Sequence, residues 1–323
     1  MVSKLREILV RLKNTNPWLL YLWLENHRKK GIENLNSHGD REAIIALYES
    51  YCGKTPDLEN PSDWGEKMQW LKLNYHNPLQ TVCSDKYEAR NYVADKGYAH
   101  TLNEVLQIVE NIDQIDTASL PIQFVAKATH GSGWNMVCAD KTKVNWYIWR
   151  QIYTSWLKNN IYWPGREWPY KDMPHRIIFE KFLKDESGAL MDYKFFCFEG
   201  KPSFVQANKG RDTAIHAQNF YDLNWDVLPF GKDLLPLPDV DIPKPTMLAE
   251  MIKMAEDLAG DFPFVRVDLY QTDGKIVFGE LTFYPKSGLP DFVPAEYNMT
   301  IGKQLQLPKK LLFSHLTSDC LID

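Results

Sequence analysis

Two stretches near the carboxyl end of the 323-residue chain alternate between apolar and polar positions. Residues 264–271 and 275–283 both follow this pattern, which is typical of a strand with one buried face. Between them stands Thr272-Asp273-Gly274, a sequence that favours a tight turn. We therefore predict an antiparallel hairpin over residues 264–283.

The length of the turn decides which side chains of this hairpin share a face. A two-residue turn would oppose Asp268 to Gly279 and place Glu280 on the other face. A three-residue loop, with Gly274 left-handed, would oppose Arg266 to Glu280 and gather the polar side chains on one face. We predict the three-residue loop and a shared cleft opposite the strand that carries Lys127. The gathered set is Arg266, Asp268, Glu280 and Thr282.

The rest of the chain changes from helical patterns to strand patterns at Gly97. Capping residues predict the first two clear helices, with Asp40 beginning one and Ser84 the other. Helices are predicted over 1–31, 40–52, 65–75, 84–96, 145–158 and 246–258. Strands are predicted over 122–128, 135–139, 175–183, 192–198 and 202–207. Many of the strands are joined by hairpins, so the pattern indicates an α+β body rather than a doubly wound parallel sheet.

The net charge of −5 argues against nucleic acid as a partner, because phosphate backbones require clustered cations. The five cysteines are scattered and form no CxxC pair, so neither a disulfide framework nor a zinc site is indicated. We expect a cytoplasmic protein.

Residues 1–35 are an exception to this charge balance, with seven basic side chains against three acidic ones. The apolar run 18–24 between the basic clusters is too short to span a bilayer. A basic, tryptophan-bearing helix pair could lie on the anionic inner face of a membrane. The alternative, which we favour, is a helix that packs on the protein's own body.

A lysine and a glycine-rich loop follow one another in the first predicted strand pair. Lys127 lies near the end of strand 122–128, and the loop contains Gly131, Ser132 and Gly133. Polyphosphates need backbone N–H groups at close range, which glycine permits, and a fixed positive charge. A simple glycine turn between two strands is the alternative.

Two further patterns suit the remaining parts of a nucleotide. The apolar strand ending in Glu180-Lys181 could seat adenine through main-chain groups, and Asp192 downstream could bind ribose hydroxyls. Glu180 and Lys181 could equally form a surface ion pair. The carboxylates of Asp268 and Glu280 suit Mg²⁺ beside phosphate, although one Arg–Glu pair on a solvated strand is the alternative.

The order of these motifs resembles the ATP-grasp superfamily, and within it the TupA-like branch linked to teichuronopeptide and other surface-polysaccharide synthesis. The resemblance spans about residues 40–305 and includes a helix that opens with Ser84-Asp85-Lys86. The stretches that carry it are Asn60-Pro61, 66–72, 130–133, 192–198, 265–270 and 278–285. It implies an ATP-grasp fold, in which two α+β subdomains clasp ATP. The implied divisions are a helical region at 1–80, an ATP-grasp domain at 81–305 and a tail at 306–323.

The resemblance also implies roles for individual residues. Arg266 would stabilise the transition state, and Asp268 and Glu280 would hold Mg²⁺. The residues implied to bind ATP are Lys86, Lys127, the mobile lid Gly131, Ser132 and Gly133, the adenine-slot residues Glu180, Lys181 and Leu183, and then Asp192 and Lys194. Thr282 stands where many ATP-grasp enzymes have a metal-binding Asn. Lys286-Ser287-Gly288 replaces the Gly-Ser-Gly common in the branch.

The implied activity is an ADP-forming, ATP- and Mg²⁺-dependent ligase that joins a carboxylate to an amine through an acyl phosphate. The implied substrates are an amino acid and a uronic-acid-bearing saccharide, in capsule or O-antigen assembly. Three alternatives stay open. They are a phosphotransferase, a glycosyltransferase-like enzyme that uses a sugar nucleotide, and a non-catalytic nucleotide-binding partner of a membrane synthase.

Overall fold

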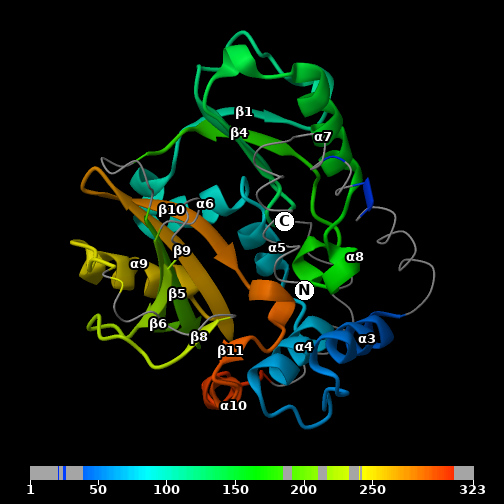
Figure 1. The fold of residues 1–323 in the computed structure, drawn as a ribbon, viewed down its shortest axis with the longest axis vertical. Helices are drawn as coiled ribbons and strands as arrows, with labels where there is room; N and C mark the ends of the chain where they lie inside the picture. The colour runs from blue at the N-terminus through cyan, green and yellow to red at the C-terminus, as the bar shows by residue number, and fades with distance from the viewer. Residues whose placement is uncertain are drawn as a thin grey trace, which may run out of the picture.

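The computed structural model describes residues 21, 25, 26, 39–184, 191–209, 217–232, 240 and 242–308. Within these residues the strands form a four-stranded sheet, a five-stranded sheet and a two-stranded ribbon. Helices α5 (Pro78–Ser84) and α6 (Ala89–Val93) lie between the two larger sheets (Figure 1). The molecule therefore has two lobes, each built on its own sheet.

The smaller lobe is built on an antiparallel sheet with the order β1-β4-β2-β3. Its strands are β1 (Val105–Val109), β2 (Phe124–Ala128), β3 (Asn135–Cys138) and β4 (Ile177–Lys181). Helix α7 (Trp146–Lys158) begins at Asn145, whose side chain accepts a hydrogen bond from the Ile148 amide. Its buried aromatic side chains, among them Trp149 and Tyr153, pack against Phe124 and Phe179 of the sheet.

The larger lobe is built on an antiparallel sheet with the order β10-β9-β5-β6-β7. Its strands are β5 (Met191–Phe198), β6 (Lys201–Lys209), β7 (Ala217–Tyr221), β9 (Phe264–Thr272) and β10 (Lys275–Thr282). Helix α9 (Leu248–Ala259) covers one face, where the Cys197 thiol lies 3.9 Å from the Ala255 carbonyl. Val265, opposite Cys197, points to this apolar face, so Arg266 points to the other face.

Four further helices and a two-stranded ribbon complete the main elements of the described residues. They are α3 (Asp40–Cys52), α4 (Trp64–Asn74), α8 (Tyr162–Gly165), α10 (Glu296–Gly302), and the ribbon strands β8 (Gly231–Lys232) and β11 (Phe292–Val293). Trp64 at the start of α4 meets Phe264 edge-on, with ring centroids 4.8 Å apart, and is fully buried. Helix α4 therefore shares one hydrophobic core with the larger sheet.

The β9–β10 hairpin forms, but the predicted three-residue loop is wrong. Thr272 pairs directly with Lys275, so the turn has two residues, and both Asp273 and Gly274 are left-handed. A bulge at Gly279 then shifts the register by one residue, which opposes Glu280 to Asp268 rather than to Arg266. The four polar side chains still share one face because the bulge compensates for the shorter turn.

Two predicted helix starts are also wrong. Helix α3 does span 40–52, but its N-cap is Gly39, and Asp40 lies in the first turn. The helix predicted over 84–96 is broken: Ser84 ends α5, a turn follows, and α6 begins at Ala89. The Asp85 carboxylate causes the break, because it accepts hydrogen bonds from the amides of Tyr87 and Glu88.

Most of the basic amino-terminal segment, including the predicted 1–31 helices, lies outside the described residues. Its membrane-facing role stays a prediction. Among the described residues, no helix has both the length and the apolar character needed to cross a bilayer.

Candidate active site

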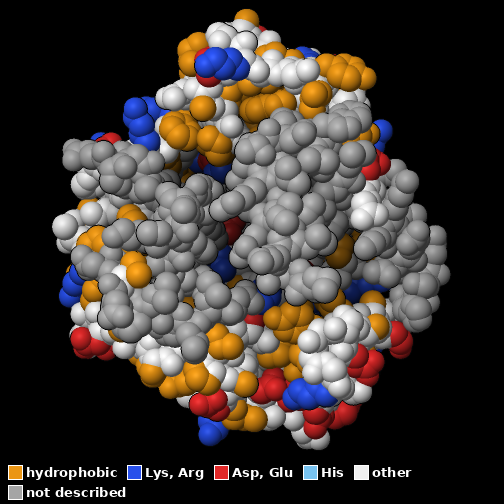
Figure 2. Space-filling model, viewed as in Figure 1, with side chains coloured by type: hydrophobic (Ala, Val, Ile, Leu, Met, Phe, Trp, Pro, Cys, Tyr) orange, Lys and Arg blue, Asp and Glu red, His pale blue; other side chains and the backbone are white. Residues whose placement is uncertain are grey.

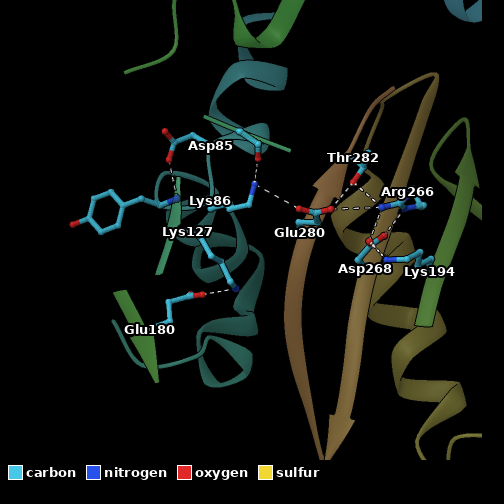
Figure 3. A network of polar contacts seen from close by, with 11 residues as sticks. Asp85, Lys86, Lys127, Glu180, Lys194, Arg266, Asp268, Glu280 and Thr282 are labelled. Atoms are coloured by element: carbon cyan, nitrogen blue, oxygen red, sulfur yellow. Dashed lines mark hydrogen bonds and ion pairs between the residues drawn. The ribbon is translucent and has the colours of Figure 1, made fainter. Parts of the chain in front are cut away.

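Lys86 lies where the two lobes meet. Its ammonium donates a hydrogen bond to the Gly131 carbonyl at 2.7 Å and lies 3.7 Å from the Glu280 carboxylate of the larger sheet (Figure 3). Gly131 is buried under Trp134, where a Cβ atom would lie 2.4 Å from the indole ring. Ser132 and Gly133 are exposed at the tip of the loop. One lysine therefore links the glycine-rich loop to the carboxylates of the hairpin.

Lys127 and Glu180 form an ion pair inside the smaller lobe. They lie on the adjacent strands β2 and β4, with Nζ and Oε2 2.6 Å apart, and Arg90 lies 3.8 Å from the same carboxylate. Lys181 points elsewhere, 3.7 Å from Glu104 on the surface, so Glu180 and Lys181 do not pair with each other. Leu183 follows the end of β4 and is half-buried.

Arg266 holds a network on the cleft face of the larger sheet (Figure 3). Its guanidinium donates two hydrogen bonds of 2.6 Å to Asp268, one of 3.1 Å to the Thr282 hydroxyl, and lies 3.6 Å from Glu280. Lys194 on the neighbouring strand β5 contacts the Asp268 carboxylate at 2.5 Å. The structure thus brings together all four hairpin residues predicted to act together.

Asp192 is tied to this network through Lys194. The Lys194 ammonium lies 2.7 Å from Asp192 Oδ2, and both side chains are almost fully buried. The two residues are separated by one position on β5 and therefore point to the same face of the sheet. The predicted ribose ligand belongs to the same polar layer as Asp268.

Glu280 stays ionised at any ordinary pH. Partial desolvation in the cleft raises its pKa, but the cations of Lys86, Arg266, Lys194 and Lys127 outweigh this and lower the pKa to about 2. Its side chain is 40% exposed, whereas Asp268 is 1% exposed. Glu280 is therefore the carboxylate of the cluster that a ligand in the cleft can reach.

The two hairpin carboxylates fit Mg²⁺ only in company with other ligands. Asp268 already accepts three of the four hydrogen bonds that a carboxylate can take, whereas Glu280 faces the opening. In the described part of the chain no three His, Cys, Asp or Glu side chains group as a metal site. Mg²⁺ commonly takes one or two carboxylates and completes its shell with water and substrate phosphates. The donor set suits that mode of binding.

Arg176 supports the candidate site, and the sequence pattern did not reveal it. Its guanidinium lies 3.3 Å from Asp85 and 2.8 Å from Glu88, and stacks over the Tyr87 ring. These contacts fix the turn that carries Lys86. A single arginine at the start of an apolar strand gives no signal of its own, because its partners lie about 90 residues earlier.

Near the centre of Figure 2 a few acidic and basic side chains are visible between the regions drawn in grey. A cavity of about 430 Å³ opens beside the network, and its walls include Gly131, Ser132, Arg266, Glu280 and Thr282. The predicted loop and the predicted hairpin thus line one space, while the Lys127–Glu180 pair is not among its lining residues.

Two stacked histidines fix the base of the glycine-rich loop to α7. The rings of His130 and His175 lie 4.0 Å apart. His130 donates a hydrogen bond to the Trp156 carbonyl, and His175 donates one to the Leu157 carbonyl, both near the end of α7. Burial, and then the neighbouring His175, lower the pKa of His130 to about 3. His130 is therefore neutral in the folded protein.

This pKa predicts a loss of stability in acid. An unfolded histidine has a pKa of about 6.5, so below that pH the unfolded chain takes up a proton that folded His130 refuses. The contribution of His130 to the free energy of unfolding should be level above about pH 6.5. It should fall by up to about 1.4 kcal/mol per pH unit on acidification. Urea titrations at pH 7 and pH 5 measure this.

The matched variants are His130→Gln and His100→Gln, since His100 is exposed. The first should lose the extra pH dependence and the second should keep it. An equal slope in wild type and His130→Gln would show that His130 is not the group responsible.

The two lobes, the glycine-rich loop between β2 and β3, and the carboxylate-bearing hairpin define the ATP-grasp fold, so the predicted fold class is confirmed. The chain belongs to the TupA-like ATPgrasp family, whose model matches residues 66–306. No curated protein matches the chain.

Solved ATP-grasp structures are similar at low identity. One is the ATP-grasp ligase PsnB complexed with minimal precursor (9% identity, 68% of this chain, 59% of that chain, TM-score 0.38). Another is D-alanine–D-alanine ligase from Bacillus anthracis complexed with ATP (14% identity, 77% of this chain, 64% of that chain, TM-score 0.37). A third is phosphoribosylamine–glycine ligase from Thermotoga maritima (11% identity, 65% of this chain, 50% of that chain, TM-score 0.39). The present chain thus spans less than two thirds of the length of each.

Proposed function

We propose that this protein is an ADP-forming, ATP-dependent carboxylate–amine ligase. The observation that carries the proposal is the position of Lys86, which contacts the glycine-rich loop on one side and Glu280 of the Arg266 network on the other. A phosphate chain placed there would meet cations from both lobes. Membership of the ATP-grasp family supports the same reaction class.

Residues of both lobes would bind the nucleotide, the phosphates and adenine mainly at the smaller lobe and the ribose at β5 of the larger lobe. Lys86, Lys127 and the amides of the loop 131–133 would hold the phosphates. For Lys127 this requires its ammonium to exchange Glu180 for phosphate, or to share the two. The main chain of 180–183 would line the adenine slot, and Asp192 with Lys194 would lie at the ribose side.

The residues of the larger lobe would act on the transferring phosphoryl group. Arg266 presents a fixed positive charge, which stabilises charge that develops in the transition state. Glu280, and the remaining acceptor position of Asp268, would hold Mg²⁺. The metal supplies charge neutralisation on the phosphate oxygens when it is bound.

The substrate assignment rests on the family resemblance. The acid would be a uronic-acid-type saccharide and the amine an amino acid, joined during surface-polysaccharide synthesis. The nucleotide-binding residues would lie within 81–305, the predicted ATP-grasp domain, while helix α4, which precedes it, shares the core of the larger sheet. Contact of residues 1–35 with an anionic membrane would bring the enzyme to a lipid-linked saccharide.

Nucleotide binding gives the first test. ADP or ATP with Mg²⁺ is expected to raise the melting temperature, because a ligand at about 100 times its Kd adds about 2.7 kcal/mol of stability. UDP-sugars should have no effect. A thermal-shift series measures both, and the reverse ranking would favour the glycosyltransferase-like alternative.

The reaction itself is tested with hydroxylamine as the amine and with glucuronate and galacturonate as trial acids. A ligase should release ADP in step with a hydroxamate, and ¹⁸O from the carboxylate should appear in phosphate. ADP formed without transfer of that oxygen, with a hydroxyl group as acceptor, would mean phosphotransfer instead. ATP binding without turnover of any acid would favour the non-catalytic partner.

A further inference from the structure

The cavity beside Arg266 and Glu280 has a second wall that the proposed reaction leaves unused. This wall comes from the segment 159–170 and from the loop after β10, far apart in sequence. Its aromatic side chains are Tyr170 and Tyr284, and Trp134, next to the glycine-rich loop, adds a third aromatic ring to the cavity. A volume of about 430 Å³ suits a small molecule rather than a polymer.

Most charged residues of the cavity wall are already paired. Arg266 and Glu280 lie 3.6 Å apart, and Lys286 lies 3.9 Å from Asp291 and donates to the Tyr51 hydroxyl. Among the described residues that line the cavity, Glu167 is the charged side chain that forms no ion pair within 4 Å. A carboxylate so placed is a ready partner for a cationic ligand.

Glu167 lies beside a polar chain at the back of the cavity. The Lys72 ammonium, 2% exposed, donates to Ser287 Oγ at 2.9 Å, and the Ser287 hydroxyl, which lies beside Glu167, donates to the Gly165 carbonyl at 3.5 Å. Gly165 permits this approach, because a Cβ there would lie 2.6 Å from Ser287 Oγ and 3.0 Å from Glu167 Oε1. Glu167 thus lies beside polar groups from two other segments, α4 and the loop after β10.

The loop that carries Ser287 is strained. Lys286 and Ser287 both adopt left-handed backbone angles, with φ of 53° and 57°, which non-glycine residues rarely do. Gln69 of α4 holds the strained turn by donating to the carbonyls of Ser287 and Gly288 at 3.2 and 2.9 Å. Strain that the surroundings maintain in this way is concentrated at functional sites.

We propose that this cavity binds the amine substrate, an amino acid or similar primary ammonium compound, and that Glu167 receives its ammonium group. The aromatic wall would cover the carbon skeleton, and the nitrogen would lie on the same side of the cleft as Arg266. This inference rests on the ligase function proposed above and adds the residue that selects the amine.

The electrostatics of Glu167 agree with such a ligand. Burial raises the pKa of Glu167, while Lys72 and the Ser287 hydroxyl oppose that rise only in part. Glu167 in turn contributes to the raised pKa values of Tyr170 and Tyr284. Lys72 acts on Glu167 without forming an ion pair with it, and a ligand ammonium in the cavity would add a cation in direct contact with the carboxylate.

The test uses the full-length protein and thermal shift with the twenty standard amino acids, each compared with its N-acetyl derivative. At least one amino acid is expected to raise the melting temperature, and its N-acetyl derivative, which has no ammonium, is not. In Glu167→Gln the affinity for that amino acid should fall roughly 10- to 100-fold, the loss typical of a hydrogen bond to a charged group. The affinity of Glu167→Asp for that amino acid should lie between those of the wild type and Glu167→Gln.

Glu104→Gln is the matched control, because Glu104 is an exposed carboxylate paired with Lys181 away from the cavity. It should bind the amino acid as the wild type does. Wild-type protein that no amino acid stabilises, or Glu167→Gln protein that binds as tightly as wild type, would overturn the inference.

A parallel titration with ADP and Mg²⁺ separates this inference from the proposed function. Glu167→Gln should retain the ADP-dependent stabilisation. If ADP stabilises the wild type and amino acids do not, the amine site is wrong and the nucleotide site stands. If ADP has no effect on the wild type, the proposed ligase function itself fails.

Discussion

Arg266→Ala is expected to lower kcat by roughly 10²- to 10³-fold, the loss typical when one preorganised charge-stabilising contact is removed. Arg266 is the cation whose bonds to Asp268 and Thr282 fix it on the cleft face before any substrate arrives. Nucleotide affinity should change little, because Lys127 and the glycine-rich loop lie on the other lobe. Initial rates at saturating ATP measure the first effect and thermal shift with ADP measures the second.

The fold must be controlled for in this experiment. Asp268 is 1% exposed and would keep only Lys194 as a charged partner, and removing one member of a buried pair typically costs about 3–5 kcal/mol. Arg266→Lys keeps the charge and loses the paired hydrogen bonds, so it should be more stable than Arg266→Ala and still slow. If Arg266→Ala and Arg266→Lys are both folded and both have the wild-type kcat, Arg266 takes no part in catalysis.

Local patterns predicted the strands of the hairpin but not their register. The alternation around Arg266 and Asp268 is set by burial of one sheet face, which the sequence records directly. The bulge depends on tertiary contact: a Cβ at Gly279 would lie 2.8 Å from the Asp268 carbonyl. An isolated glycine in a strand is typical of a bulge, but the predicted register did not take this signal into account.

The broken helix before the glycine-rich loop illustrates a different limit. Ser84 followed by Glu88 and Gly97 is a good helix pattern, and Gly97 is indeed left-handed. Asp85 instead closes a turn by accepting hydrogen bonds from the Tyr87 and Glu88 amides at Oδ1, while Arg176 donates to its other oxygen. A partner about 90 residues away is invisible to a capping rule.

Some residues of the candidate site could likewise be predicted from sequence motifs, and others could not. Lys86, Arg266 and Glu280 belong to compact motifs with a fixed order, so they could be named from the sequence and the structure brings them together. Glu167 and Ser287 belong to no motif. Their significance comes from a cavity formed by three segments, which only the folded chain assembles.

Glu280→Gln is expected to lower kcat at least about 10²-fold and to raise the Mg²⁺ concentration needed for half-maximal rate. Wild-type Glu280, with a pKa of about 2, is fully charged at neutral pH and lies between Lys86 and Arg266. Glutamine keeps the shape but supplies no charge, so a metal ion in the cleft would lose its accessible carboxylate. Rates measured across a Mg²⁺ series give both quantities.

Stability should change little in this variant, because ion pairs of a side chain 40% exposed contribute modestly, on the order of 1 kcal/mol or less. Thr282→Asn is the matched control, since asparagine is the residue that many ATP-grasp enzymes have there and offers an oxygen of its own. It should retain activity with an unchanged or lower Mg²⁺ requirement. If Glu280→Gln is slow but its Mg²⁺ dependence equals that of wild type, Glu280 serves to orient Lys86 and Arg266 and does not hold the metal.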